Sequence, residues 1–413
     1  MMAVSLNVQV AIPCITAPIN STDVNNHTFA QGSSIYLLKG SDQASTCLNC
    51  HNAPDTNPSS YHISTNGMSP YDSTSPVEMG PGGDFAWLKK TMTFVVNGNT
   101  TTYDGVDHGH NIVAADFGYT SDTIRSTAPG GSYPSDNLAC SSCHDPHGRY
   151  RRFADGTYNT TGVPIFGSGS YNNSADPVSG VSAAGAYRIL GGNGYQPKSL
   201  TGSFAFTQDP MDVVVNTTYN RSEATAQTGV AYGSNVSEWC GNCHSAMAPN
   251  GAGVNQHSHP AGNASTLTAD IVTNYNAYVS SGVMTNTNTG AAFSTLAPFQ
   301  INSTDRAVLK PLAQTAANYT SQYMPAASIS DSVMCLTCHR AHATAFYGMF
   351  RWNSVGSNFM TAADSNNAAI YDTVNGSNTG YNQTQQQNAY YGRPASTLGP
   401  NARSYCNKCH NMS

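Results

Sequence analysis

The pentapeptide Cys47-Leu-Asn-Cys50-His51 decides how this 413-residue chain folds, because its pattern occurs five times. The pattern has two cysteines three positions apart and a histidine directly after the second cysteine. The five copies use ten of the 11 cysteines and five of the 13 histidines. The other four copies are Cys140-Ser-Ser-Cys143-His144, Cys240-Gly-Asn-Cys243-His244, Cys335-Leu-Thr-Cys338-His339 and Cys406-Asn-Lys-Cys409-His410.

The spacing within each copy suits one cofactor. Two thiols at this distance can add across the two vinyl groups of one porphyrin edge, and the adjacent imidazole then lies under the iron. Zinc sites and disulfides also use paired thiols, but zinc would not require a histidine after every pair and disulfides need none. The repeats therefore predict five covalently bound haem c (heme c) groups. The predicted proximal iron ligands are His51, His144, His244, His339 and His410.

Eight further histidines can supply the second axial ligand of each iron. Five irons with two imidazoles each need five of them, which predicts bis-histidine ligation and no open position for a substrate. His147 and His342 each lie three residues after a proximal histidine, and are therefore better placed to reach the iron of a neighbouring haem. A surface or hydrogen-bonding role is favoured for His108 and His257. None of the 13 methionines recurs at a fixed offset from the motifs.

The composition is unusual for a chain of this length. Charged residues make up 10% of the sequence, against roughly 25% in typical soluble domains. Hydrophobic residues make up 39%, and there are 37 glycines and 21 prolines. Such a chain has little material for long helices or a large apolar core, and porphyrins would supply the missing apolar surface. The net charge of -6 gives no basic patch and argues against a nucleic-acid partner.

The sequence also limits the compartment and the organisation of the chain. No run approaches the roughly 18 to 20 apolar residues of a membrane span. No Lys or Arg precedes Lys39, so the charged start of a signal peptide is missing. Because haems of this kind are attached outside the cytoplasm, we interpret the chain as the mature form of a protein exported through the periplasm.

The expected fold class is mostly irregular coil with short helices and very few short strands, in an elongated cytochrome whose core is made of stacked haems. Turn-forming residues occur throughout, and no linker divides residues 47–413, which we interpret as one pentahaem unit preceded by an N-terminal segment, 1–46. Short helices are expected at Ser330 to Phe346, Asn235 to Met247 and Ile271 to Ser280, and short strands at Thr91 to Val96 and Asp212 to Val215.

Several stretches outside the motifs carry a resemblance to a known family. They include Ser60-Tyr-His-Ile-Ser-Thr65, Pro81-Gly-Gly-Asp-Phe85, Gly109-His-Asn-Ile-Val113, Gly194-Tyr-Gln-Pro-Lys-Ser-Leu200 and Cys338-His-Arg-Ala-His342. From about residue 59 to 410 the chain resembles the filament-forming, outer-surface multihaem c-type cytochromes of metal-reducing bacteria. The resemblance implies identical subunits stacked head to tail, with bis-histidine haems forming a continuous wire and one distal histidine donated by the adjacent subunit.

By position, the resemblance implies five distal ligands: His62, His110, His147, His259 and His342. The chain departs from the family at its start, where members have a sixth haem motif followed by the histidine that reaches the next subunit. Here that region contains only Cys14 and no histidine from Ala11 to Asn20. Cys14 is interpreted as a vestige, a free thiol or an intermolecular disulfide partner. His27, the only histidine before the first motif, is the candidate substitute for the intersubunit ligand.

The function that the resemblance implies is extracellular electron transfer, through a polymerised cytochrome at the cell surface, to acceptors such as metal oxides or partner cells. Other redox cytochromes are expected partners, and catalytic residues are not expected. A monomeric periplasmic or surface electron shuttle is the first alternative. A multihaem reductase, such as a nitrite reductase, is less favoured because these enzymes typically carry one Cys-x-x-Cys-Lys motif, and the sequence has none.

Overall fold

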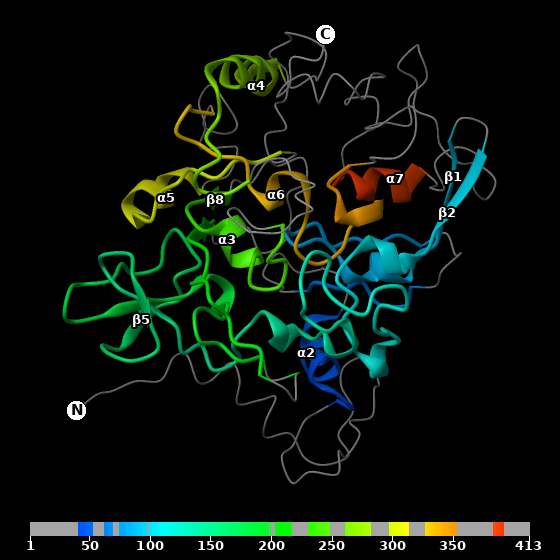
Figure 1. Cartoon of the computed structure of the whole chain (residues 1–413), viewed down its shortest axis with the longest axis horizontal. Helices are drawn as coiled ribbons and strands as arrows, with labels where there is room; N and C mark the ends of the chain where they lie inside the picture. The colour runs from blue at the N-terminus through cyan, green and yellow to red at the C-terminus, as the bar shows by residue number, and fades with distance from the viewer. Residues whose placement is uncertain are drawn as a thin grey trace.

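The computed structural model describes residues 40–52, 62–68, 74–96, 99–197, 199, 203–216, 230–247, 261–281, 297–313, 327–352 and 383–391. Most of these residues form coil and turns, with short helices and strands between them (Figure 1). Across these ranges no helix is both long enough and apolar enough to cross a membrane. The expected fold class, mostly coil with few regular elements, is confirmed.

The helices are short because glycine, proline and small polar residues interrupt every apolar pattern. The α-helices are α2 (Gln43–His51), α3 (Val236–Cys240), α4 (Ala269–Ser281), α5 (Arg306–Leu312), α6 (Cys335–Cys338) and α7 (Gln383–Ala389). Single 3₁₀ turns are η1 (Phe85–Lys89), η2 (Gly105–His108), η3 (Ala115–Phe117), η4 (Ser135–Asn137), η5 (Cys140–Ser142), η6 (Tyr187–Ile189) and η9 (Tyr347–Met349). The start of α2 is fixed by Asp42, whose carboxylate accepts the Ser45 N–H at 2.7 Å.

Within the described ranges, the strands form three small sheets. β1 (Met92–Val96) and β2 (Asn99–Tyr103) make an antiparallel hairpin, at the right of Figure 1. A four-stranded sheet has the order β4-β3-β6-β5, in which only the β5–β6 pair is parallel, and β7 pairs antiparallel with β8. The bounds of these strands are β3 (Arg151–Arg152), β4 (Tyr158–Asn159), β5 (Ile165–Gly167), β6 (Ala183–Gly185), β7 (Val213–Val215) and β8 (Val230–Tyr232).

The predicted elements agree with the structure where the pattern is local. The helix expected at Ile271 to Ser280 lies within α4, and the two expected strands coincide with β1 and β7. The other two expected ranges also contain a helix, but a shorter one: α3 ends at the first cysteine of the third motif, and α6 ends at the second cysteine of the fourth. The chain after α6 uses its backbone groups for tertiary pairing instead, since the N–H of His342 donates to the Gly82 carbonyl at 2.7 Å.

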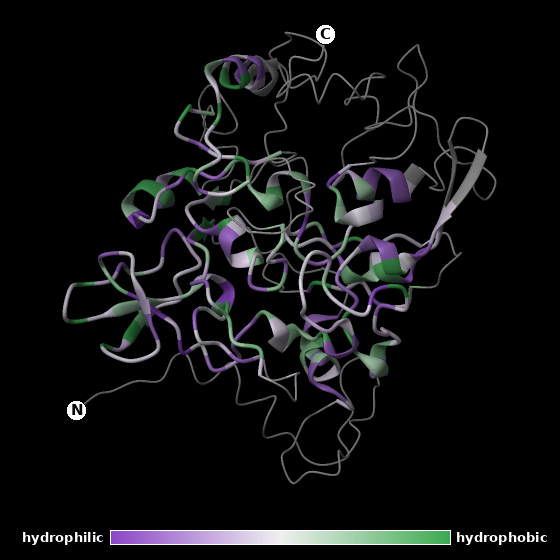
Figure 2. Cartoon of the chain, in the orientation of Figure 1, coloured by the Kyte–Doolittle hydropathy of each residue, from purple (hydrophilic) through white to green (hydrophobic). Residues whose placement is uncertain are grey.

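The apolar core of the described part is divided into separate clusters rather than one layer. Figure 2 shows short hydrophobic segments interrupted by hydrophilic ones along the ribbon. One cluster contains Leu48 and packs against Cys140, and another contains Leu336 and packs against Cys143. Both leucines stand between the two cysteines of a motif, so the clusters anchor the motif turns.

Asp84 organises the loop that precedes η1. Its carboxylate is fully buried and accepts the Thr65 N–H at 3.0 Å, the Thr65 hydroxyl at 2.5 Å, the Glu78 N–H at 3.1 Å and the Ala86 N–H at 2.8 Å. Burial raises the pKa of Asp84, and the hydrogen bonds oppose that shift. One carboxylate therefore joins three separate stretches of coil and caps η1.

Candidate haem-binding sites

Four of the five motifs lie within the described residues, and each is on or beside a short helix: the first motif ends α2, η5 and α6 lie inside the second and fourth motifs, and α3 ends at the first cysteine of the third. The backbone closes these turns, with the N–H of His144, His244 and His339 donating to the carbonyl of the first cysteine of its motif at 3.0 to 3.1 Å. Side chains three and four positions apart share one face of a helical turn. The turn therefore presents both thiols and the imidazole on the same side, as thioether attachment and iron ligation from one segment require.

The motif turns are packed in two pairs. η5 packs on α2, where the Ser141 hydroxyl donates to the Gln43 side chain, and α6 packs on α3, where the N–H of Cys335 donates to the Ser237 hydroxyl at 3.0 Å. The first thiols of paired motifs touch. Contact with Cys47, together with burial, raises the pKa of Cys140, and contact with Cys335 does the same for Cys240. The first motif therefore packs against the second, and the third packs against the fourth.

Four imidazoles have their Nδ1 atoms held by backbone carbonyls. The distances from Nδ1 to the carbonyl oxygen are 2.7 Å for His144 (to Arg188), 2.8 Å for His244 (to Pro129), 2.9 Å for His339 (to Gly348) and 2.7 Å for His110 (to Ala341). A carbonyl can only accept, so each Nδ1 carries the proton and each Nε2 keeps its lone pair. This arrangement fixes the tautomer and orientation of metal-ligating histidines in general.

His110 faces His244. Their ring centroids are 6.1 Å apart and their planes are inclined by 30°. With metal–nitrogen bonds of about 2 Å, two imidazoles on opposite sides of one metal have centroids about 6 Å apart. Burial and then the neighbouring His244 lower the pKa of His110 to about 4, and burial lowers the pKa of His244, so both rings are neutral and able to ligate. The separation fits one iron between the two rings.

His342 lies closer to His144 than its place in the sequence suggests. Burial lowers the pKa of His342 to about 3, and the next largest contribution comes from His144, not from His339 in its own motif. Its ring stacks on Phe85, with centroids 4.6 Å apart and planes 19° apart. Phe85 belongs to the cluster that contains Leu48 and packs against Cys140, so this candidate distal histidine lies near the first two motifs.

Three glycines hold the segment that carries His342. A Cβ atom on Gly82 would lie 2.5 Å from Nδ1 of His342, and a Cβ on Gly109 would lie 2.5 Å from the His342 carbonyl oxygen. Gly83 has a φ of +83°, and a Cβ there would overlap the Ala343 carbonyl. The backbone of His342 and Ala343 can lie between these two segments only because all three positions lack a side chain. Sequence reasoning missed this role, although Pro81-Gly-Gly was part of the resemblance.

The remaining candidate ligands are placed in different ways. His62 is half-buried beside the first motif, where the N–H of the next residue, Ile63, donates to the His51 carbonyl at 3.0 Å. His147 is exposed, with Nδ1 3.7 Å from Asp145. The candidates that lie outside the described residues are Cys406, Cys409, His410, His259 and His27, together with Cys14 and His257.

His108 departs from the surface or hydrogen-bonding role that was favoured for it. The side chain is fully buried, and neither ring nitrogen has a hydrogen-bond partner. Burial lowers its pKa to about 4. Its surroundings seal both nitrogens, whereas His110, two residues later, is only partly covered. In the His-Gly-His sequence, the ring of His108 is therefore packed in the interior, whereas the ring of His110 is available to bind a metal.

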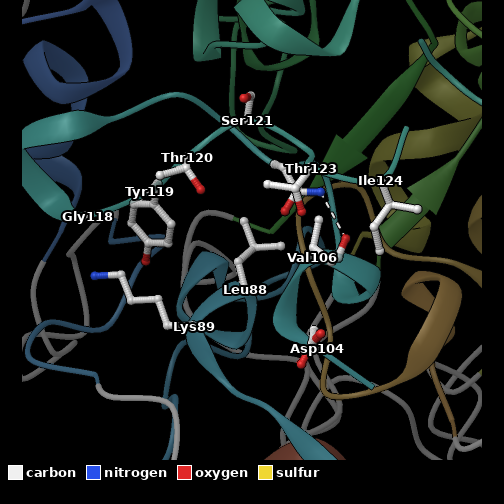
Figure 3. A pocket seen from close by; sticks show the side chains of 11 residues that line it. Leu88, Lys89, Asp104, Val106, Gly118, Tyr119, Thr120, Ser121, Thr123 and Ile124 are labelled. Carbon is white, nitrogen blue, oxygen red and sulfur yellow. Dashed lines mark hydrogen bonds between the residues drawn. The ribbon is translucent and has the colours of Figure 1, made fainter. Parts of the chain in front are cut away.

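A cavity of about 260 Å³ lies apart from these imidazoles, and its lining contains no cysteine or histidine (Figure 3). Lys89 is at one side, where its ammonium donates to the Phe117 carbonyl at 2.5 Å and lies 4.4 Å from the centre of the Tyr119 ring. Leu88, Val106 and Asp104 complete the part of the wall nearest η1 and η2. The cavity has none of the donors that haem attachment needs.

The donors of the four described motifs fit haem c. Paired thiols are available for the two thioether bonds, and imidazoles with protonated Nδ1 atoms offer Nε2 to iron from both sides at His110 and His244. Because the motif turns pack in two pairs, the thiols and imidazole of the first motif lie next to those of the second, and those of the third lie next to those of the fourth. This arrangement suits several haems in close contact.

Comparison with known proteins agrees with this chemistry. No family model matches the sequence. The C-type cytochrome OmcS of Geobacter sulfurreducens is 49% identical over 377 residues, which cover 91% of this chain and 85% of that protein. Two solved filament structures from Geobacter sulfurreducens have a similar fold, each with a TM-score of 0.81 and with 97% of this chain and 98% of the matched chain covered. The cryo-EM structure of the OmcS nanowires is 45% identical to this chain, and the structure of the outer membrane cytochrome S filament is 44% identical. The protein is a haem c-binding cytochrome, and it belongs to the OmcS family of c-type cytochromes.

Proposed function

We propose that this chain is the repeating subunit of an extracellular cytochrome filament that carries electrons to external acceptors such as metal oxides or partner cells. The observation that carries the proposal is the opposed pair His110 and His244, with each Nδ1 fixed on a carbonyl and the centroids 6.1 Å apart. Such a pair would hold one haem iron from both sides. The solved relatives are filaments, described as OmcS nanowires and as an outer-membrane cytochrome filament of Geobacter sulfurreducens.

Each residue type has one task in this proposal. The ten paired cysteines hold five haem c groups, and the five motif histidines ligate the irons on one side. The distal ligands are His62, His110, His147, His259 and His342. Bound haem iron accepts and releases single electrons by changing between the ferrous and ferric states. Protein ligands on both sides exclude substrates and water from the metal, which is why we assign electron transfer and not catalysis.

The first 46 residues are proposed to contact the neighbouring subunit, and residues 47–413 to form one pentahaem unit. His27 is the proposed ligand across the subunit junction. The chain reaches the cell surface through the periplasm, where its haems are attached. Other redox cytochromes deliver its electrons. A monomeric shuttle remains the alternative, and it differs from the filament in needing no contact between subunits.

Five haems per chain are expected from the five complete motifs. Intact-mass measurement should show five additions of roughly 0.6 kDa each, the mass of a haem joined by thioether bonds. Cys14 has no second thiol or adjacent histidine, so it should add nothing. A sixth addition would show that Cys14 holds a haem by a single bond, and the proposed count would be wrong.

His27→Ala tests the filament. The protein should keep five haems by mass, gain one high-spin or water-ligated iron, and form shorter or fewer filaments in electron micrographs. A metal bond across the junction would be lost, and exposed ion pairs, each contributing about 0 to 1 kcal/mol, would not replace it. Purified wild-type protein that stays monomeric in the micrographs would favour the shuttle. Normal low-spin filaments from the variant would place the junction elsewhere.

A further inference from the structure

Two segments of four residues hold the second and the fourth cysteine motif in the same way. We call residues 188–191 the first clip and residues 348–351 the second clip; they begin within η6 and η9. The carbonyl of the first residue in each clip accepts the Nδ1–H of a motif histidine, at 2.7 Å from His144 and at 2.9 Å from His339. The third residue of each clip forms an antiparallel bridge with the same histidine. Each clip therefore runs alongside its motif histidine and holds the imidazole ring of that histidine.

Two further backbone bonds recur in both clips. The N–H of the residue after the histidine donates to the carbonyl of the second clip residue, and the N–H of the fourth clip residue donates to the carbonyl of the second cysteine. The four bonds are Asp145 to Ile189 at 2.8 Å, Arg340 to Met349 at 3.1 Å, Gly191 to Cys143 at 2.9 Å and Arg351 to Cys338 at 2.8 Å. Each clip therefore fastens three consecutive residues: the second cysteine, the histidine and the residue that follows it.

The first two residues of each clip have a left-handed backbone. Their φ angles are +48° and +52° in the first clip (Arg188 and Ile189) and +67° and +62° in the second (Gly348 and Met349). Residues other than glycine rarely adopt this region, and β-branched ones least of all. Ile189 is β-branched and 45% exposed, so packing of its side chain contributes little to this conformation. Such backbones persist only where surrounding contacts impose them, and here those contacts are the bonds to the motif.

The clip does not depend on the chain that leads to it. Arg188 lies 44 positions after His144, and the four-stranded sheet lies between them, whereas Gly348 lies nine positions after His339. Connections of such different length end in the same contacts. The geometry of the clip is therefore imposed by the motif that it holds and not by the connection.

The third motif is held differently. Nδ1 of His244 also donates to a carbonyl, that of Pro129, but of Pro129 and the next residue only Gly130 is left-handed, with a φ of +65°. The Gly130 carbonyl accepts the N–H of Ala246, which lies two residues after the histidine instead of one. The second and fourth motifs are also the two whose proximal histidine is followed three positions later by another histidine. The clip with two left-handed residues thus coincides with the His-x-x-His sequences.

We propose that the two clips position the histidines of the His-x-x-His sequences. Each clip holds the proximal ring by its Nδ1 and sets the direction in which the chain continues toward the histidine three residues on. Ile189 and Met349 are the positioning residues, because each lies between the two peptide groups whose carbonyls accept these bonds. A left-handed residue directs both carbonyls to the same side, as in a turn of helix, whereas an extended residue directs them to opposite sides. The inference rests on the proposed function, because it takes His144 and His339 as iron ligands.

The test changes the φ angle that residue 189 can adopt. Ile189→Gly permits the left-handed backbone without strain, so the clip should persist and the urea midpoint of unfolding should rise. Ile189→Pro fixes φ near about −65°, which is incompatible with the left-handed backbone, so the clip should open. The measurement is NMR of the reduced, haem-loaded protein with ¹⁵N-labelled histidine. Exchange of the His144 Nδ1 proton with water should be about tenfold faster or more in Ile189→Pro, and unchanged in Ile189→Gly. The Nδ1 proton of His339 should be unaffected in both variants.

Ile329 supplies the matched control. It is 62% exposed and lies in a turn, and its φ is not positive. Ile329→Gly should lower the urea midpoint, because glycine ordinarily increases the conformational freedom of the unfolded chain. Ile329→Pro should leave both ring protons unchanged. Met349→Gly and Met349→Pro repeat the experiment in the second clip, where the His339 proton should respond and the His144 proton should not.

The outcomes separate the inference from the proposed function. A slowly exchanging His144 proton in Ile189→Pro would overturn the positioning role. A urea midpoint that falls as far in Ile189→Gly as in Ile329→Gly would also overturn it, and this comparison decides the matter if the proline variant does not fold. The proposed function fails on another observation: ring signals of His144 and His339 that lack the shift imposed by a bound haem would show that these histidines ligate no iron, whatever the exchange rates are.

Discussion

Replacing His110 with alanine should create one carbon monoxide site per chain. The variant keeps both thiols of its motif, Cys240 and Cys243, and the proximal His244, so its haem remains attached. The distal side loses its imidazole, and the ring that stood 6.1 Å from His244 is gone. The reduced protein should then bind about one equivalent of carbon monoxide and show one high-spin iron, because an iron with one protein ligand keeps an open position. The wild type should bind little, because the proposed function gives every iron two protein ligands.

His108→Ala is the matched control for this experiment. His108 is only two residues away, but both of its ring nitrogens are sealed among other side chains. Its removal should cost stability through the space it leaves and should open no iron. Carbon monoxide binding by His108→Ala and not by His110→Ala would reverse the ligand assignment. Intact mass should show five haems in both variants.

Replacing Asp84 with alanine should reduce the free energy of unfolding by roughly 4 kcal/mol, since it leaves buried donors without an acceptor. The carboxylate accepts four hydrogen bonds, two from Thr65 and one each from Glu78 and Ala86, and the last of these caps η1. The measurement is urea unfolding, followed by the Soret band and by tyrosine fluorescence. Asp84 also directly follows Gly83, which packs on Ala343, so its loss should loosen the segment that holds His342.

Asp84→Asn distinguishes the causes of that loss. Asparagine keeps one carbonyl oxygen at nearly the same place, and should therefore preserve about half of the hydrogen bonds and about half of the stability. Equal losses in the alanine and asparagine variants would show that the negative charge itself is needed. Wild-type stability in the alanine variant would mean that water or neighbouring side chains satisfy the donors.

The sequence predicted the parts of the site that depend on local spacing. Two cysteines and a histidine at positions one, four and five share a face of any helical turn, so the chemistry of each motif could be inferred without a structure. The helix near Ile271 and the strand before Val215 were likewise found where apolar residues cluster. The scarcity of charged and apolar residues predicted the coil-rich fold, since separate small clusters replace a single core.

The pairing of ligands could not be predicted in this way. His110 and His244 are far apart in the sequence, and only tertiary packing brings their rings face to face. The groups that fix the imidazoles are backbone carbonyls, including that of Pro129, and any residue type offers the same carbonyl. For His108 the sequence suggested an environment that the structure does not have. A polar residue two positions from a ligand resembles a second ligand or a surface group, yet tertiary packing buries it without a partner.

The glycines around His342 have a consequence for how this chain can vary. Gly82, Gly83 and Gly109 carry no chemistry, yet a single methyl group at any of them would meet the segment of His342 and Ala343 at 2.5 Å or less. A mutation at any of these three glycines can thus displace His342, although none of the three is a candidate ligand or a haem attachment residue. A library screened for retained haem colour would keep such mutants, because the thioether bonds survive, and would lose them only when selected for ligand binding or electron flow. In this fold, the glycines that pack against His342 should therefore tolerate substitution as poorly as the histidine itself.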